Sequence, residues 1–90
     1  MNINDLLFDD ENEEKLARRG IGVEDVLDML GQPHVVIRNK KRRRGLYKMI
    51  GKDRGGRVLT VILEATAIKN AWRPVTGWPS TVPERQLLEV

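Results

Sequence analysis

The sequence predicts a single α+β domain over residues 1–90, with two N-terminal helices packed on a four-stranded, mainly antiparallel sheet and a short C-terminal helix. Three observations support this fold class. Apolar residues recur at helical spacing in the first third of the chain and in strand-like runs after residue 33. Two adjacent glycines separate two of these runs, as in a tight hairpin. Ninety residues leave room for one hydrophobic core.

Helix signals occur twice before the first strand-like run. Asp9 or Asp10 can cap a first helix that has acids in its first turn, bases near its end, and Gly20 as its stop. A second helix is expected over residues 23–30, and Gly31 ends it. Its apolar side chains fall on one face: Val23, Val26, Leu27 and Leu30. That face must be covered by the sheet.

Four later runs are rich in Val, Ile, Leu and Trp and are expected to be strands: residues 34–38, 46–51, 58–64 and 68–75. The glycines in residues 53–56 favour a hairpin, so the second and third strands should be antiparallel neighbours. Ser80 or Thr81 can cap a short final helix that runs through Leu88. With helices on one face of the sheet, the other face is left to water or to a ligand.

Composition excludes several classes of function. The chain has no cysteine, so it can form neither disulfides nor a thiolate metal site. His34 is the only histidine, which makes a zinc site unexpected and a structural role at a strand start the preferred interpretation. No apolar run approaches the roughly 20 residues that span a bilayer, and the acidic N-terminus does not resemble a secretory signal. A cytoplasmic protein without a membrane partner is expected.

Charge is sorted along the chain. Residues 1–37 contain nine acids and three bases, a net charge of −6, whereas residues 38–73 contain twelve bases and two acids, a net charge of +10. The overall charge of +3 therefore hides a strongly cationic middle. Such a segment attracts partners that carry phosphates and speeds their encounter.

The residues present favour cation chemistry over conventional hydrolase chemistry. The sequence shows no nucleophile with a histidine base, no recognisable acidic pair and no phosphate-binding glycine loop. Arginine and lysine can instead stabilise the negative charge that develops on a phosphodiester during strand cleavage. RNA supplies its own nucleophile, the 2′-hydroxyl, so a small basic sheet can cleave it without a metal or another cofactor.

Several short segments, in order, resemble the BrnT family of ribonuclease toxins. They include Phe8-Asp-Asp with the acidic helix after it, Lys15-Leu-Ala-Arg-Arg-Gly-Ile-Gly, Ile50-Gly51, Gly56-Arg57-Val-Leu-Thr-Val, Asn70-Ala-Trp-Arg73 and Glu84-Arg85. BrnT toxins belong to type II toxin-antitoxin pairs and are distantly related in fold to RelE toxins. The resemblance implies a RelE-like sheet with flanking helices, RNA cleavage without metal, and neutralisation by a cognate ribbon-helix-helix antitoxin.

This resemblance, together with the charge pattern, gives roles to individual residues. Arg73 matches the arginine of a family strand and would stabilise the developing oxyanion. Lys48 or Tyr47 would transfer a proton. The other bases would hold backbone phosphates of RNA, and they are Arg42, Arg43, Arg44, Arg54, Arg57 and Lys69.

A second function remains open, that of a non-catalytic module which binds nucleic acid or an acidic partner through the same bases. The chain has Arg18-Arg19-Gly20 where the family commonly has Lys-His-Gly, and Leu46 where it has an arginine. Structural roles are open as well. Arg73 can pair with Glu64 on the surface, and Tyr47 can simply pack. The two tryptophans, Trp72 and Trp78, are expected in the core or at an antitoxin interface, with base stacking as the alternative.

Overall fold

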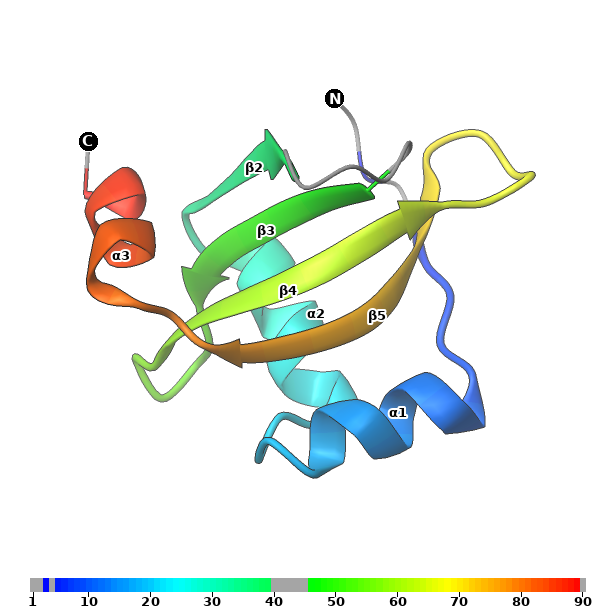
Figure 1. The fold of residues 1–90 in the computed structure, drawn as a ribbon, viewed down its shortest axis with the longest axis horizontal. Coiled ribbons are helices and arrows are strands. Elements are labelled where there is room, and N and C mark those ends of the chain that lie inside the picture. Colours follow the sequence, from blue (N-terminus) through cyan, green and yellow to red (C-terminus); the bar gives the residue numbers. More distant parts are fainter. Residues whose placement is uncertain (1–2, 4, 40–45, 90) are drawn as a thin grey trace.

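The computed structural model describes residues 3, 5–39 and 46–89 and shows three helices with a curled five-stranded mixed sheet. The helices are α1 (Asp10–Ala17), α2 (Val23–Gly31) and α3 (Val82–Leu88). The strands are β1 (Asp5–Leu6), β2 (His34–Arg38), β3 (Leu46–Lys52), β4 (Val58–Ala65) and β5 (Ala71–Pro79). Figure 1 shows α1 and α2 together on one side of the sheet, with α3 apart from them, beside β2 and β3.

The expected α+β class and all three expected helices are confirmed. Asp9 caps α1, where its Oδ1 accepts the backbone N–H of Asn12 at 2.8 Å. Gly20 follows α1 with a φ of 74°, the left-handed conformation that glycine adopts without strain. Thr81 caps α3 in a capping box with Glu84. These short polar residues set the helix boundaries that the sequence predicts.

The sheet differs from the expected four-stranded one because a fifth strand, β1, pairs parallel to β5 at its edge. The strand order is β1-β5-β4-β3-β2, and every other neighbouring pair is antiparallel. The expected hairpin between β3 and β4 is confirmed, with Gly56 at a φ of 90°. Two residues are too few to show a strand period in the sequence, which is why β1 was not predicted.

The last strand begins three residues later than expected and ends four residues later. Residues 66–70 form a turn in which the Thr66 hydroxyl donates to the carbonyl of Ala71 at 2.8 Å. The strand includes Pro74, which lies within the expected range, and continues to Pro79, beyond the expected end at residue 75. A register shift opposite Ile62 and Leu63 makes room for Pro74, because a residue at a bulge need not donate to the ladder.

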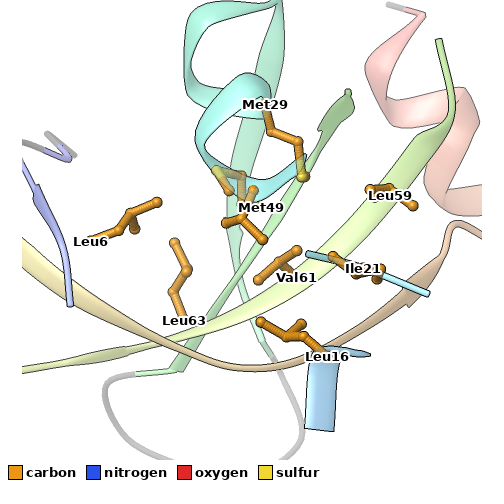
Figure 2. Close-up of a cluster of buried hydrophobic side chains, with 9 residues drawn as sticks. Leu6, Leu16, Ile21, Met29, Met49, Leu59, Val61 and Leu63 are labelled. Carbon is orange, nitrogen blue, oxygen red and sulfur yellow. The ribbon is translucent and has the colours of Figure 1, made fainter. Parts of the chain in front are cut away.

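An apolar cluster joins α1 and α2 to one face of the sheet (Figure 2). Its buried members are Leu6, Leu16, Ile21, Val26, Met29, Met49, Leu59, Val61 and Leu63. Gly77 lets α1 approach β5 closely, since a Cβ there would lie 2.8 Å from the Thr60 carbonyl oxygen and 3.2 Å from Leu16. The core thus fixes which side chains of β3, β4 and β5 point away from α1 and α2.

Candidate functional site

The sheet face opposite this core, which we term the open face, is formed by alternate side chains of β3, β4 and β5. It includes Lys48, Thr60, Ile62, Glu64, Arg73, Thr76 and Trp78. The register places Glu64 beside Arg73, Ile62 between Lys48 and Thr76, and Thr60 beside Trp78. Contrary to expectation, this face is partly covered, because α3 packs over β2 and β3.

Arg73 is held between two carboxylates at the end of the open face. Its Nη1 donates to Glu64 Oε1 at 3.0 Å, and its Nε lies 3.5 Å from Asp9 Oδ2. The Arg73 side chain is 38% exposed and that of Glu64 is 40% exposed. Within the described part of the chain, Arg73 Nη2 makes no hydrogen bond. The guanidinium is therefore fixed in place with one nitrogen available to an anion.

Lys48 lies on the same face and contacts a buried carboxylate from α3. Its Nζ is 3.3 Å from Glu84 Oε2, while Glu84 Oε1 accepts the Trp78 indole N–H at 3.0 Å. The backbone N–H of Thr81 donates to the same Oε1 at 2.8 Å. Glu84 is only 8% exposed. One carboxylate therefore fastens α3 to β3 and β5.

The surroundings of Glu84 stabilise its charged form. Burial by itself would raise the pKa of the carboxyl, but hydrogen bonds from the Thr81 backbone and from the Trp78, Thr60 and Thr81 side chains lower the pKa to about 2. The carboxylate therefore remains ionised through the whole range in which the protein is expected to work.

This low pKa gives a pH-dependent contribution to stability. Because the pKa is lower in the folded state than its ordinary value of 4.5, the contribution is complete above about pH 5 and is lost as the pH falls towards 2. At neutral pH it should reach about 3 kcal/mol. Urea unfolding of the parent and of Glu84→Gln should differ by that order at pH 7 and converge near pH 2. If the difference in unfolding free energy between the two proteins stayed the same from pH 7 to pH 2, the lowered pKa of Glu84 would be contradicted.

Tyr47 points to the other side of the sheet from Lys48, because consecutive strand residues face opposite ways. Its ring makes an edge-to-face contact with Trp72, with centroids 5.0 Å apart and planes at 83°. Trp72 in turn packs against the core cluster. Tyr47 and Lys48 thus do not meet in one site, and the packing interpretation of Tyr47 and Trp72 agrees with the structure.

Arg57 was expected to bind RNA but is engaged within the protein. Its guanidinium contacts Asp53 at 2.8 Å, Asp25 at 3.1 Å and the Gly20 carbonyl at 3.0 Å. Burial would raise the pKa of Asp53, yet hydrogen bonds from the side chain and backbone of Arg57 lower it, and the Asp53 hydrogen bond raises the pKa of Arg57. Arg57 therefore links the β3–β4 hairpin to the segment between α1 and α2.

Removing this link should destabilise the fold without weakening RNA binding. Arg57→Ala leaves Asp53, which is 5% exposed, without its charged partner, although the backbone N–H of residue 57 still donates to it. We expect a loss of about 2 kcal/mol in the free energy of unfolding. Arg54→Ala is the matched control, since Arg54 is 86% exposed, lies 3.4 Å from Asp28 and should change stability by less than about 0.5 kcal/mol. Equal effects of the two substitutions would contradict this role.

The other predicted phosphate contacts lie at two ends of the sheet. Arg54 and Arg57 belong to the β3–β4 hairpin, about 20 Å along β4 from Glu64. Lys69 is exposed in the turn between β4 and β5, four residues before Arg73. Figure 1 shows this turn at the opposite end of β4 from the β3–β4 hairpin. Arg42, Arg43 and Arg44 lie outside the described residues. The structure thus places Arg73 and Lys48 on one face of the sheet and Lys69 in the turn before β5, and it separates Arg54 and Arg57 from them.

Sequence reasoning missed two acids that the fold brings to the open face. Glu64 was considered only as a surface partner of Arg73, and Glu84 only as part of the final helix and of the Glu84-Arg85 segment in the family resemblance. The signal for Glu64 was available, because the hairpin fixes the register of β3 and β4 and strand alternation then assigns Glu64 to the face of Lys48. Glu84 comes from another element, so no local pattern indicates its position.

Comparison with known proteins gives no assignment: no family model matches the chain, and no curated protein is significantly similar to it. In the described part of the chain, no helix is long and apolar enough to cross a membrane. Among the same residues, no three His, Asp or Glu side chains are grouped as metal ligands. The functional assignment therefore rests on the geometry of the open face.

Proposed function

We propose that this protein is a metal-independent endoribonuclease, the toxin of a type II toxin-antitoxin pair similar to the BrnT family. The observation that carries the proposal is the Arg73–Glu64 pair, in which a partly exposed guanidinium and carboxylate stand on adjacent strands 3.0 Å apart. RNA cleavage requires these two functions side by side, a base for the 2′-hydroxyl and a cation for the phosphorane.

In the proposed reaction, Glu64 removes the proton of the 2′-hydroxyl as that oxygen attacks the neighbouring phosphorus. The bond from phosphorus to the 5′-oxygen then breaks, and a 2′,3′-cyclic phosphate is left on the upstream strand. Arg73 stabilises the charge on the equatorial oxygens through Nη2. The leaving 5′-oxygen takes a proton from the Lys48 ammonium or from water. The chain's own residues balance the reaction without a cofactor.

Lys48 is close enough to assist the same phosphodiester. It lies two strands from Arg73, so the two Cα atoms are about 12 Å apart. Both side chains are long and extend from the same face, which lets their cationic ends approach one backbone segment. Lys48 must leave or share the Glu84 carboxylate to do so, and at 3.3 Å that contact is loose.

The experiment that tests this function is cleavage of RNA by the purified chain in EDTA. We expect strand cleavage by the parent and cleavage at least about a hundredfold slower by Glu64→Gln, which is purified in parallel to control for contaminating ribonuclease. Inducing the parent in cells without an antitoxin should arrest growth, whereas the variant should not. Normal growth at high expression together with intact RNA would count against the proposal.

A non-catalytic binding module is the second candidate, and one observation favours it. Arg73 is paired with Glu64 and Asp9, and Lys48 is paired with Glu84, so the open face has little uncompensated charge in the free protein. Such a face would bind RNA through the surrounding bases without cleaving it. Binding without cleavage in the assay above would favour this candidate.

Both candidates make the same prediction for salt dependence. Replacing Arg42, Arg43 and Arg44 with alanine removes three cations, so fewer counterions are released when RNA binds. The slope of log affinity against log salt should become shallower by about two units, and every RNA sequence should be weakened about equally. Filter binding of two unrelated RNAs from low to moderate salt measures it. An unchanged slope would place the phosphate contacts elsewhere.

A further inference from the structure

The two tryptophans of β5 lie on opposite faces of the sheet. Trp72 packs against the core cluster and the ring of Tyr47. Trp78 pairs with Thr60 on the open face, five residues along β5 from Arg73, and is partly exposed. The register shift between them changes which face later residues of β5 occupy. Trp78 is therefore an aromatic side chain on the face where RNA is proposed to bind.

The Trp78 ring is fixed by a hydrogen bond to a buried charge. Its Nε1 donates to Glu84 Oε1 at 3.0 Å, and Lys48 Nζ lies 3.3 Å from the other oxygen of that carboxylate. The hydroxyl of Thr60, beneath them on β4, is hydrogen-bonded to the Ser80 hydroxyl at 2.7 Å. The indole N–H edge thus points across β4 towards α3. Turning the ring away would break a bond to a charged acceptor, which is among the stronger hydrogen bonds.

The residues beneath this arrangement are shielded from solvent although neither α1 nor α2 covers them. Thr60 is 0% exposed and Ile62 is 5% exposed. Ser80, whose hydroxyl lies 2.7 Å from that of Thr60, and Glu84 of α3, which contacts Lys48 and Trp78, contribute to this cover. The indole is placed to contribute as well, because its N–H edge meets Glu84. A planar ring that covers the sheet with one side presents its other side outward. The partial exposure of Trp78 agrees with this placement.

We propose that Trp78 is a stacking platform for one nucleobase of single-stranded RNA, next to the phosphate held by Arg73 and Lys48. This subsite deepens the proposed function, since it rests on the same face as the cleavage site. A base stacked on an indole and a phosphate beside an ammonium are the two contacts that single-stranded RNA sites combine. Stacking tolerates any base, so the subsite adds affinity and fixes position without selecting a sequence.

Tryptophan fluorescence tests the proposal directly because the chain has two tryptophans on opposite faces. Trp72→Phe leaves Trp78 as the reporter, and Trp78→Phe leaves Trp72. The probe is a mixed-sequence RNA octamer with 2′-O-methyl groups, which lacks the nucleophile and stays intact. We expect saturable quenching in Trp72→Phe and little change in Trp78→Phe. An abasic octamer of equal charge should quench neither, and equal quenching by the abasic strand would overturn the proposal.

Affinity separates stacking from the structural role of the indole hydrogen bond. Trp78→Leu should weaken octamer binding about tenfold or more, whereas Trp78→Phe should retain most of the affinity because a ring remains. If the bond to Glu84 were what matters, both variants would lose it equally and bind equally weakly, which would overturn the proposal. Thermal unfolding of both variants confirms that they are folded. These binding measurements do not depend on RNA cleavage. The stacking subsite can therefore be disproved while the proposed cleavage activity is upheld, and the cleavage activity can be disproved while the subsite is upheld.

Discussion

Replacing Arg73 with alanine is expected to lower the rate of RNA cleavage about a hundredfold or more while RNA affinity falls far less. The guanidinium meets negative charge that is greatest in the phosphorane, so it contributes more to the transition state than to bound RNA. Its partial exposure means that the variant should remain folded. Single-turnover cleavage and equilibrium binding of an uncleavable RNA measure the two quantities separately.

Arg73→Lys is the matched control for this prediction. Lysine keeps the charge but lacks the planar fork that allows arginine to hold Glu64, Asp9 and a phosphate together. It should restore the rate only in part. If the cleavage rate and the RNA affinity of Arg73→Ala fell by the same factor, Arg73 would contribute to RNA binding only and not to the transition state.

Glu64→Gln should abolish most of the cleavage and yet leave RNA binding unchanged or tighter. The substitution removes the proposed base, which is worth about a hundredfold to ten-thousandfold in such reactions. It also removes a negative charge from the open face, and Arg73 retains its contact with Asp9. A misfolded variant would lose both cleavage and RNA binding, so a slower cleavage rate together with unchanged or tighter binding would not be explained by misfolding. Glu24→Gln on the exposed surface of α2 is the control, and a full cleavage rate in Glu64→Gln would exclude Glu64 as the base.

The parts of the fold that the sequence predicts are those set by local chemistry. Asp9, Gly20 and Thr81 mark helix ends through their own backbone and side-chain preferences, and Gly56 sets the hairpin. The start of β5 was misplaced, because the Thr66 turn hydrogen bonds to both Ile68 and Ala71 in a way that composition does not reveal. The strand β1 depends on pairing with β5, which is a long-range contact.

The sequence allowed us to predict which cationic residues belong to the candidate site, but not which acidic residues pair with them. Arg73 lies on a strand surface beside Glu64, as one interpretation of the sequence held. The separation of charge along the sequence suggests a stronger positive electrostatic field than the folded protein has, because acids of the first third form ion pairs with bases of the middle segment. Asp25 meets Arg57 and Asp28 meets Arg54. Charge along a chain therefore identifies a cationic segment but not which of its bases remain available to a ligand.

The chemical ends of the cleaved RNA test the central claim most directly. Attack by the 2′-hydroxyl leaves a 2′,3′-cyclic phosphate on the upstream fragment and a 5′-hydroxyl on the downstream one. A single 2′-deoxy nucleotide at the cleaved position should block the reaction there. Mass spectrometry of the fragments formed in EDTA should show these ends. Fragments with a 3′-hydroxyl and a 5′-phosphate, or cleavage that survives the 2′-deoxy substitution, would contradict the proposed mechanism.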